Sequence, residues 1–231
     1  MCGRTSLFTP QPDIERRFNA EFDHDYEPRY NIAPGDTLAV VHNEAPETIT
    51  ADTWGFVPEW AESVDDGPRP SNARAETVAE NELFRSAFEN RRALVIADGY
   101  YEWARNRGGK QPYRIARTDG DPFAMAGLWS HWKDNGETLR TVTIITTEPN
   151  DTVASIHDRM PVILEPGSES QWLDGNVGFD PSDLLQPYPD PDLEPRQIST
   201  LVNDPTNDSP AIIDPVGGSN GQTGLEDFGA D

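Results

Sequence analysis

Short apolar runs separated by glycine and proline are the feature that most constrains the fold of this chain, which has 231 residues, 18 Gly and 21 Pro. Runs of this length, bounded by turn-forming residues, are typical of β-strands. The pattern predicts strands at residues 4–8, 37–41, 47–54, 93–97, 100–104, 111–116, 123–129, 140–147 and 161–164.

Apolar residues at helical spacing predict only a few helices. These are residues 12–22, 79–90 and 150–155, with one more turn at 167–172. In the first of them, Ile14, Phe18 and Phe22 recur every four positions, which is the spacing of one helix face. Asn150 or Asp151 is the expected N-cap of the third. Because the predicted strands are not each followed by a helix, we predict an α+β fold with a mostly antiparallel sheet instead of a doubly wound parallel one.

The chain is predicted to form a single domain over residues 1–216 with a disordered acidic tail at 217–231, which is rich in Gly, Ser, Asn and Asp. Its one cysteine excludes an internal disulfide and a cysteine-rich metal site. The sequence has no run of 18 apolar residues, so we predict no membrane span, and we see no signal-peptide pattern at its start. We therefore expect a cytoplasmic protein.

The net charge of −23 comes from 41 acidic and 18 basic residues, and only Lys110 and Lys133 are lysines. Such a charge argues against nucleic acid as a partner, because phosphate binding needs positive surface. An acidic, lysine-poor surface also suits a halophilic protein. At molar salt the Debye length is only about 3 Å, so distant acidic residues would hardly repel DNA. We favour this halophilic interpretation. Residues 1–164 hold 17 of the 18 basic residues, so the arginines concentrate where the motifs lie.

Cys2 is the sharpest chemical signal. Removal of Met1 ahead of this small residue would leave an α-amine and a thiol on adjacent carbons. The α-amine has a pKa of about 7.7–8.0, so part of it is free base near neutral pH. Together the two groups can trap an aldehyde: the amine forms an imine, and the thiol closes a thiazolidine ring. The same start also suits an N-terminal-nucleophile glutamine amidohydrolase, in which the thiol attacks an amide.

Three further segments carry side chains that could support this chemistry, although each also fits an ordinary loop, edge strand or turn. Asn72 and Arg74 are two apart on extended backbone and face the same side, where they could hold a reacting group and a phosphate. Glu102 lies between aromatic residues, which would raise its pKa toward that of a general acid or base. His157 is suited to moving protons at neutral pH.

Taken together, these segments resemble the SRAP family, the SOS response-associated peptidases now regarded as abasic site processing proteins. The matching segments, in the family's order, are residues 1–4, 29–34, 54–60, 71–76, 98–103, 146–147 and 157–161, with a weaker match at 202–205. The resemblance implies one SRAP-type domain with a strongly curved β-sheet core and a few helices. It also implies autocatalytic removal of Met1, a cysteine-type peptidase activity.

The resemblance also implies a set of functional residues. The implied catalytic residues are Cys2, Asn72, Glu102 and His157. Cys2 would form the thiazolidine with an abasic deoxyribose, Asn72 would position the reacting groups, and the other two would shuttle protons. The implied DNA-binding residues are Arg4, Pro34, Trp60, Arg74 and Thr147. The two arginines would hold phosphates, and the other three would line the path of the strand.

The implied partner is single-stranded DNA with abasic sites, including junctions with duplex, as arises in the DNA damage response. Aldehyde trapping needs only proton transfers, so no metal or organic cofactor is expected. A halt at the imine stage would permit lyase-like strand cleavage. We expect a monomer that is nucleoid-associated when bound to DNA. A module that binds single-stranded DNA without a covalent bond remains an alternative, beside the amidohydrolase.

Overall fold

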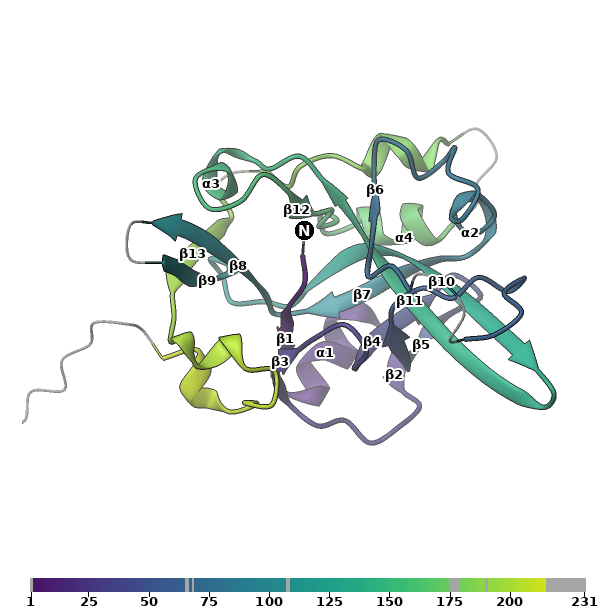
Figure 1. Ribbon diagram of the computed structural model, residues 1–231, viewed down its shortest axis with the longest axis horizontal. Coiled ribbons are helices and arrows are strands. Elements are labelled where there is room, and N and C mark those ends of the chain that lie inside the picture. Colours follow the sequence, from purple (N-terminus) through teal and green to yellow (C-terminus); the bar gives the residue numbers. More distant parts are fainter. Residues whose placement is uncertain are drawn as a thin grey trace, which may run out of the picture.

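The computed structural model describes residues 2–64, 67, 69–106, 109–174, 179–189 and 191–214 (Figure 1). Met1 and the predicted tail at 217–231 lie outside the described residues. The strands are β1 Thr5–Leu7, β2 Glu21–Phe22, β3 Arg29–Ile32, β4 Thr37–His42, β5 Ala45–Trp54, β6 Asn72–Arg74, β7 Arg92–Ala97, β8 Gly99–Asn106, β9 Gly109–Arg117, β10 Phe123–Asp134, β11 Glu137–Thr147, β12 Met160–Pro161 and β13 Leu193–Gln197. The α-helices are α1 Gln11–Phe18, α2 Arg85–Asn90, α3 Asp151–Ala154 and α4 Ser168–Leu173, and short 3-10 turns are η1 Pro181–Leu184, η2 Thr200–Asn203 and η3 Pro210–Ile212.

The larger sheet closes on itself. Its strands follow the order β12-β11-β10-β7-β4-β5-β2, and β11 pairs with β5 as well as with β10. This second pairing is parallel and sets Val142 opposite Trp54. The ring β11-β10-β7-β4-β5 is therefore a small barrel whose other neighbouring strands are antiparallel. The prediction of a strongly curved, mostly antiparallel α+β domain is confirmed.

A second sheet, in the order β13-β9-β8-β1-β3, leaves the barrel at the junction between β7 and β8. Asp98 lies at this junction, and its buried carboxylate accepts hydrogen bonds from the backbone N–H groups of Phe8 (2.6 Å) and Thr9 (2.9 Å) and from the Ser6 hydroxyl (2.7 Å). A charged acceptor binds such donors strongly. Asp98 thus fixes the end of β1 against the start of β8, which is a structural role.

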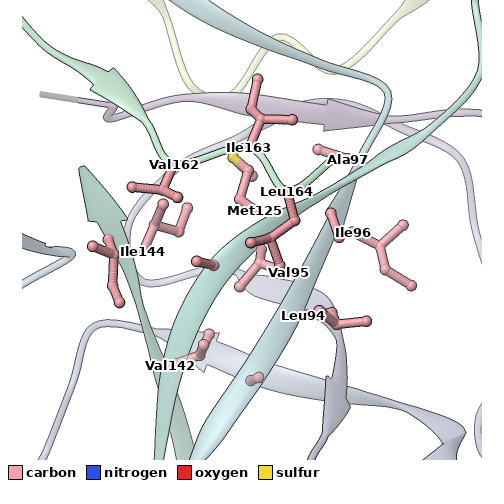
Figure 2. Packing of buried hydrophobic residues seen from close by; sticks show 14 of the residues in the cluster. Leu94, Val95, Ile96, Ala97, Met125, Val142, Ile144, Val162, Ile163 and Leu164 are labelled. Atoms are coloured by element: carbon pink, nitrogen blue, oxygen red, sulfur yellow. The ribbon is translucent and has the colours of Figure 1, made fainter. Parts of the chain in front are cut away.

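The core fills the barrel and the space beneath its helices. Side chains from β7, β10 and β11 interdigitate with those of residues 162–164, as Figure 2 shows. Every residue of β7 is buried, because one side of the strand faces the barrel interior and α2 and α4 pack against the sheet. Arg92 is buried with its guanidinium donating to the carbonyls of Trp172 (2.6 Å) and Phe88 (2.9 Å). Because both faces of β7 are buried, the strand is continuously apolar after Arg92, whereas a half-exposed strand would alternate apolar and polar residues.

Two predicted helices are shorter than expected. The first ends at Phe18 because Asn19 adopts a left-handed conformation (φ 50°), after which β2 pairs with β5. The second begins only at Arg85, and the residues ahead of it form turns, one of them held by the Asn81 side chain. Asn and Asp side chains that bond to nearby backbone compete with helix formation in this way.

The predicted strands occur with shifted ends, except that the one expected at 161–164 shares only Pro161 with β12, and the structure adds β2, β3, β6 and β13. These are short or rich in polar residues, so periodicity does not reveal them. The hairpin of β10 and β11 is longer than predicted because Asn135 (φ 47°) and Gly136 (φ 89°) form its turn. Two positive φ angles in succession match the right-handed twist of the flanking strands. Among the described residues, no helix combines the length and apolar character that crossing a membrane requires.

Candidate active site

Cys2 and Asn72 meet although 70 positions separate them. Cys2 lies three residues before the start of β1 and is fully buried. β6 lies parallel to β11, with Asn72 opposite Ile144. From there the Asn72 Nδ2 donates a hydrogen bond of 2.8 Å to the carbonyl oxygen of Cys2. The short strand β6, which sequence periodicity did not predict, therefore holds the start of the chain in place.

Glu102 and His157 form the second half of the site. Glu102 lies on β8, which pairs with β1, and its Oε2 is 3.8 Å from the Nε2 of His157. Only 3% of Glu102 is exposed, and this burial raises the pKa of its carboxyl to about 8. The charge of Asp158 raises it further, whereas the positive amino terminus lowers it. Glu102 is therefore largely protonated at neutral pH and can donate a proton.

His157 lies in the turn between α3 and β12, and backbone contacts orient its ring. α3 is capped by Asn150, one of the two N-caps that the sequence predicted, and its Oδ1 accepts from the N–H of Val153 (3.0 Å). The His157 Nδ1 accepts from the N–H of Arg159 (3.0 Å). The same Nδ1 lies 3.1 Å from the Asp158 Oδ1, and these contacts direct Nε2 of a neutral ring toward Glu102. Burial lowers the pKa of His157, which favours that neutral ring.

The electrostatics of the site favour the amine over the thiol as the first nucleophile. Burial raises the pKa of the Cys2 thiol well above its ordinary value, and the nearby Glu102 carboxylate raises it further. A thiol with a raised pKa stays protonated and is weakly nucleophilic. The α-amine that loss of Met1 would free has an intrinsic pKa near neutrality, so it is the group available to attack a carbonyl.

Sequence reasoning missed Tyr100. It is two residues before Glu102 on β8 and hence on the same face of the strand. It is fully buried, and no described residue hydrogen-bonds its hydroxyl. Burial and then the charges of Cys2 and Glu102 raise the pKa of Tyr100 far above its ordinary value. The period-two spacing from Glu102 was the signal that could have identified it.

The predicted DNA-binding residues differ in exposure. Pro34 and Arg74 are exposed, and so is Trp60, whose side chain is 71% exposed beside an apolar groove of about 370 Å³. Arg4 is half-buried and donates both of its hydrogen bonds to described residues through one guanidinium nitrogen. Thr147 is only 4% exposed, and its hydroxyl donates to the Leu185 carbonyl (3.4 Å). It is therefore the one predicted DNA-binding residue that is buried.

Trp54 shows the contrast with Trp60. It is 1% exposed, and its Nε1 donates to the carbonyl of Ser71 (2.8 Å). This bond fixes the segment that leads into β6 and so places Asn72. Of the two tryptophans of residues 54–60, the first supports the site from the core, and the second is exposed on the surface.

Comparison with known proteins identifies the family. The family model for SOS response associated peptidase (SRAP) matches residues 1–205. The chain is 40% identical to the "Abasic site processing protein YoqW" of Bacillus subtilis, over 93% of this chain and 99% of that protein. It is 30% identical to the "Abasic site processing protein YedK" of Escherichia coli, over 94% of this chain and 100% of that protein.

A crystal structure of a protein from Bacteroides thetaiotaomicron has the same fold, with a TM-score of 0.84 and 26% identity. The match covers 93% of this chain and 99% of that one. The family model and the two relatives support the resemblance that the motifs carry, and the solved structure supports the fold that brings these motifs together. The chain belongs to the SRAP family.

Proposed function

We propose that this protein processes abasic sites in single-stranded DNA by forming a covalent thiazolidine through Cys2. The observation that carries the proposal is the convergence of Asn72, Glu102 and His157 around the buried start of the chain. The relatives named as abasic site processing proteins support the substrate class. Loss of Met1, by the protein's own peptidase activity, would free the amine that the reaction needs.

The reaction needs no group beyond those in the chain and the lesion. The ring-opened sugar presents an aldehyde, and the Cys2 amine adds to its carbon. Glu102 protonates the hydroxyl of this adduct, which leaves as water, and the nitrogen then returns a proton to the Glu102 carboxylate, which gives a neutral imine. The S–H bond of the thiol then adds across the C=N bond: sulfur bonds to carbon and the proton goes to nitrogen. One water is lost overall, and no electrons are gained or lost.

Each neighbouring side chain suits one step. Glu102, with a pKa near 8, can donate the proton that expels water. Neutral His157 can accept a proton as the sugar ring opens to the aldehyde. Asn72 holds the Cys2 carbonyl through Nδ2, while its buried Oδ1 has no hydrogen-bond partner among the described residues and is available to the amine or the sugar.

The surface residues suit a strand that passes without being read for sequence. Arg74 and Arg4 would bind phosphates, and Trp60 would stack on an unpaired base. Pro34 would line the same path, and Thr147 would do so only after local rearrangement. The excess of acidic residues fits a protein that works in concentrated salt, where distant charges are screened. We further propose that it acts as a monomer, on junctions as well as single strands, in the cytoplasm and bound to the nucleoid.

The test is to incubate mature protein with single-stranded DNA that bears one abasic site. We expect a denaturant-stable adduct, absent from Cys2→Ala. Cys2→Ser keeps the amine but not the thiol, so its adduct should persist only after reduction of the imine with borohydride. Intact mass should show loss of the Met1 residue. Equal adduct yields from Cys2→Ala and wild type would overturn the proposal, and release of ammonia from small amides would favour the amidohydrolase.

A further inference from the structure

Asn31 is a buried side chain with every polar atom in use. It lies on β3, in the segment at residues 29–34 to which the function above assigns only Pro34. Its Oδ1 accepts from the Arg4 guanidinium at 2.5 Å. Its Nδ2 lies within bonding distance of three carbonyl oxygens, those of Asn207 (2.8 Å), Asp204 (3.1 Å) and Val202 (3.3 Å).

All three carbonyls belong to one stretch, residues 198–213, which we call the C-terminal segment. It is tied to β3 at a second point, where the Asp208 carboxylate accepts from the backbone N–H groups of Tyr30 (2.5 Å) and Asn31 (3.1 Å). The segment is also held by its own apolar side chains, since Ile198, Val202 and Ile212 pack on Tyr101 of β8. The segment is thus a built part of the domain, and Asn31 is its main polar anchor.

Asn31 and the C-terminal segment hold the Arg4 guanidinium by one end. One terminal nitrogen, Nη1, donates to Asn31 Oδ1 and to the Val202 carbonyl (2.6 Å), and the guanidinium lies 5.9 Å from the centre of the Trp103 ring. Among the described residues, Nε and the other terminal nitrogen have no hydrogen-bond partner, and no carboxylate forms an ion pair with Arg4. Its hydrogen bonds go to neutral acceptors, and the Asp36 and Asp204 carboxylates interact with its charge without forming an ion pair.

We propose that Asn31, with the C-terminal segment behind it, is a positioning residue that aims Arg4 at the phosphate beside the lesion; this rests on the proposed function. A long arginine side chain loses rotamer freedom when it binds, and an arginine already held in place avoids that loss. The two remaining donor positions match the fork with which arginine binds phosphate oxygens. Asn31 itself touches neither DNA nor the reacting atoms.

The experiment is a double-mutant cycle with Asn31→Ala, Arg4→Ala and both together. The readout is the equilibrium binding of single-stranded DNA without a lesion, across a salt series. We expect each single variant to bind about tenfold more weakly and the double variant no more weakly than Arg4→Ala. Loss of one phosphate contact should also flatten the dependence of log K on log salt by about 0.7 for a single strand.

Asn207→Ala is the matched control. It removes the bond from the Asn207 side chain to the Leu201 carbonyl but leaves the backbone carbonyl that Asn31 uses, so binding and slope should stay unchanged. If Asn31→Ala does not fold, Asn31→Ser replaces it in the same cycle. A merely structural asparagine would weaken binding equally with and without Arg4, and that additivity would overturn the inference. If Arg4→Ala itself binds normally, the phosphate role assigned to Arg4 fails instead, whereas adduct formation through Cys2 is tested separately.

Discussion

Arg159 and Glu76 form a bidentate ion pair, with the two terminal guanidinium nitrogens 2.5 and 3.0 Å from the two carboxylate oxygens. Arg159 also donates to the carbonyl of Thr146 on β11 (2.5 Å). The pair joins the turn that carries His157 to the segment that follows β6. Two motifs that are far apart in the sequence are therefore mechanically connected, and Arg159 is the residue that also orients the His157 ring through its N–H.

We expect Glu76→Gln to slow adduct formation about five- to tenfold, because a loosened turn lets His157 leave the site. Folding stability should change little, since half of the Glu76 side chain is exposed and exposed ion pairs contribute about 0–1 kcal/mol. Single-turnover rates at saturating DNA give the measurement. Glu80→Gln, an exposed residue of the same turn region, should keep the wild-type rate.

The raised pKa of Glu102 predicts how stability varies with pH. In the folded chain the carboxyl keeps its proton up to about pH 8, whereas in the unfolded chain it releases it near its ordinary value of 4.5. The folded state thus binds more protons across this interval, so this group's contribution to the free energy of unfolding falls as pH rises through it.

Glu102→Gln removes that titration. Thermal melts at about pH 5 and about pH 8 should show the variant gaining stability relative to wild type as pH rises, with no further gain above the folded pKa. Glu82→Gln, which changes an exposed carboxyl, is the control and should show no such divergence. A constant difference between Glu102→Gln and wild type would contradict the buried, protonated carboxyl.

Tyr100 and Tyr101 predict opposite results for the same chemical change. Both are fully buried, but the Tyr101 hydroxyl donates to the Tyr30 carbonyl (2.6 Å), whereas the Tyr100 hydroxyl has no described partner. Removing an unsatisfied buried hydroxyl is neutral or stabilising, and breaking a buried hydrogen bond costs about 1–3 kcal/mol. Denaturant unfolding should therefore show Tyr100→Phe at least as stable as wild type and Tyr101→Phe less stable. The reverse order would show that Tyr100 has a partner in solution.

Trp60 and Trp54 form a second pair. Because Trp60 is 71% exposed, we expect Trp60→Ala to fold with wild-type stability but to bind single-stranded DNA more weakly by about 1–3 kcal/mol, the value of one base stack. Trp54→Ala should instead destabilise the fold by about 3–5 kcal/mol, since it empties a core site. Melting temperature and DNA titration separate the two effects. Unchanged DNA binding by Trp60→Ala would remove stacking from the proposed path.

The sequence alone determined the class of fold and the reactive groups that the chain can offer. Apolar runs between turn residues predicted the strands of the barrel, because burial requires apolar side chains at those positions whatever the arrangement. The identities of Cys2, Glu102 and His157 set which proton transfers are possible, since these are properties of single side chains. The local Asn150 cap was predictable for the same reason: its partner is three residues away.

The tertiary structure decided what depends on long-range pairing. Contacts between distant residues set the pairing of the two-residue strand β2 with β5, the parallel pairing of β6 with β11, and the closure of β5 on β11. Together with the pairing of β1 with β3 and β8, they place Asn72 on the Cys2 carbonyl, bury Glu102 enough to raise its pKa, and set Asn31 between Arg4 and the C-terminal segment. Burial and direction are properties of the surroundings of a residue, and only the folded chain supplies those surroundings.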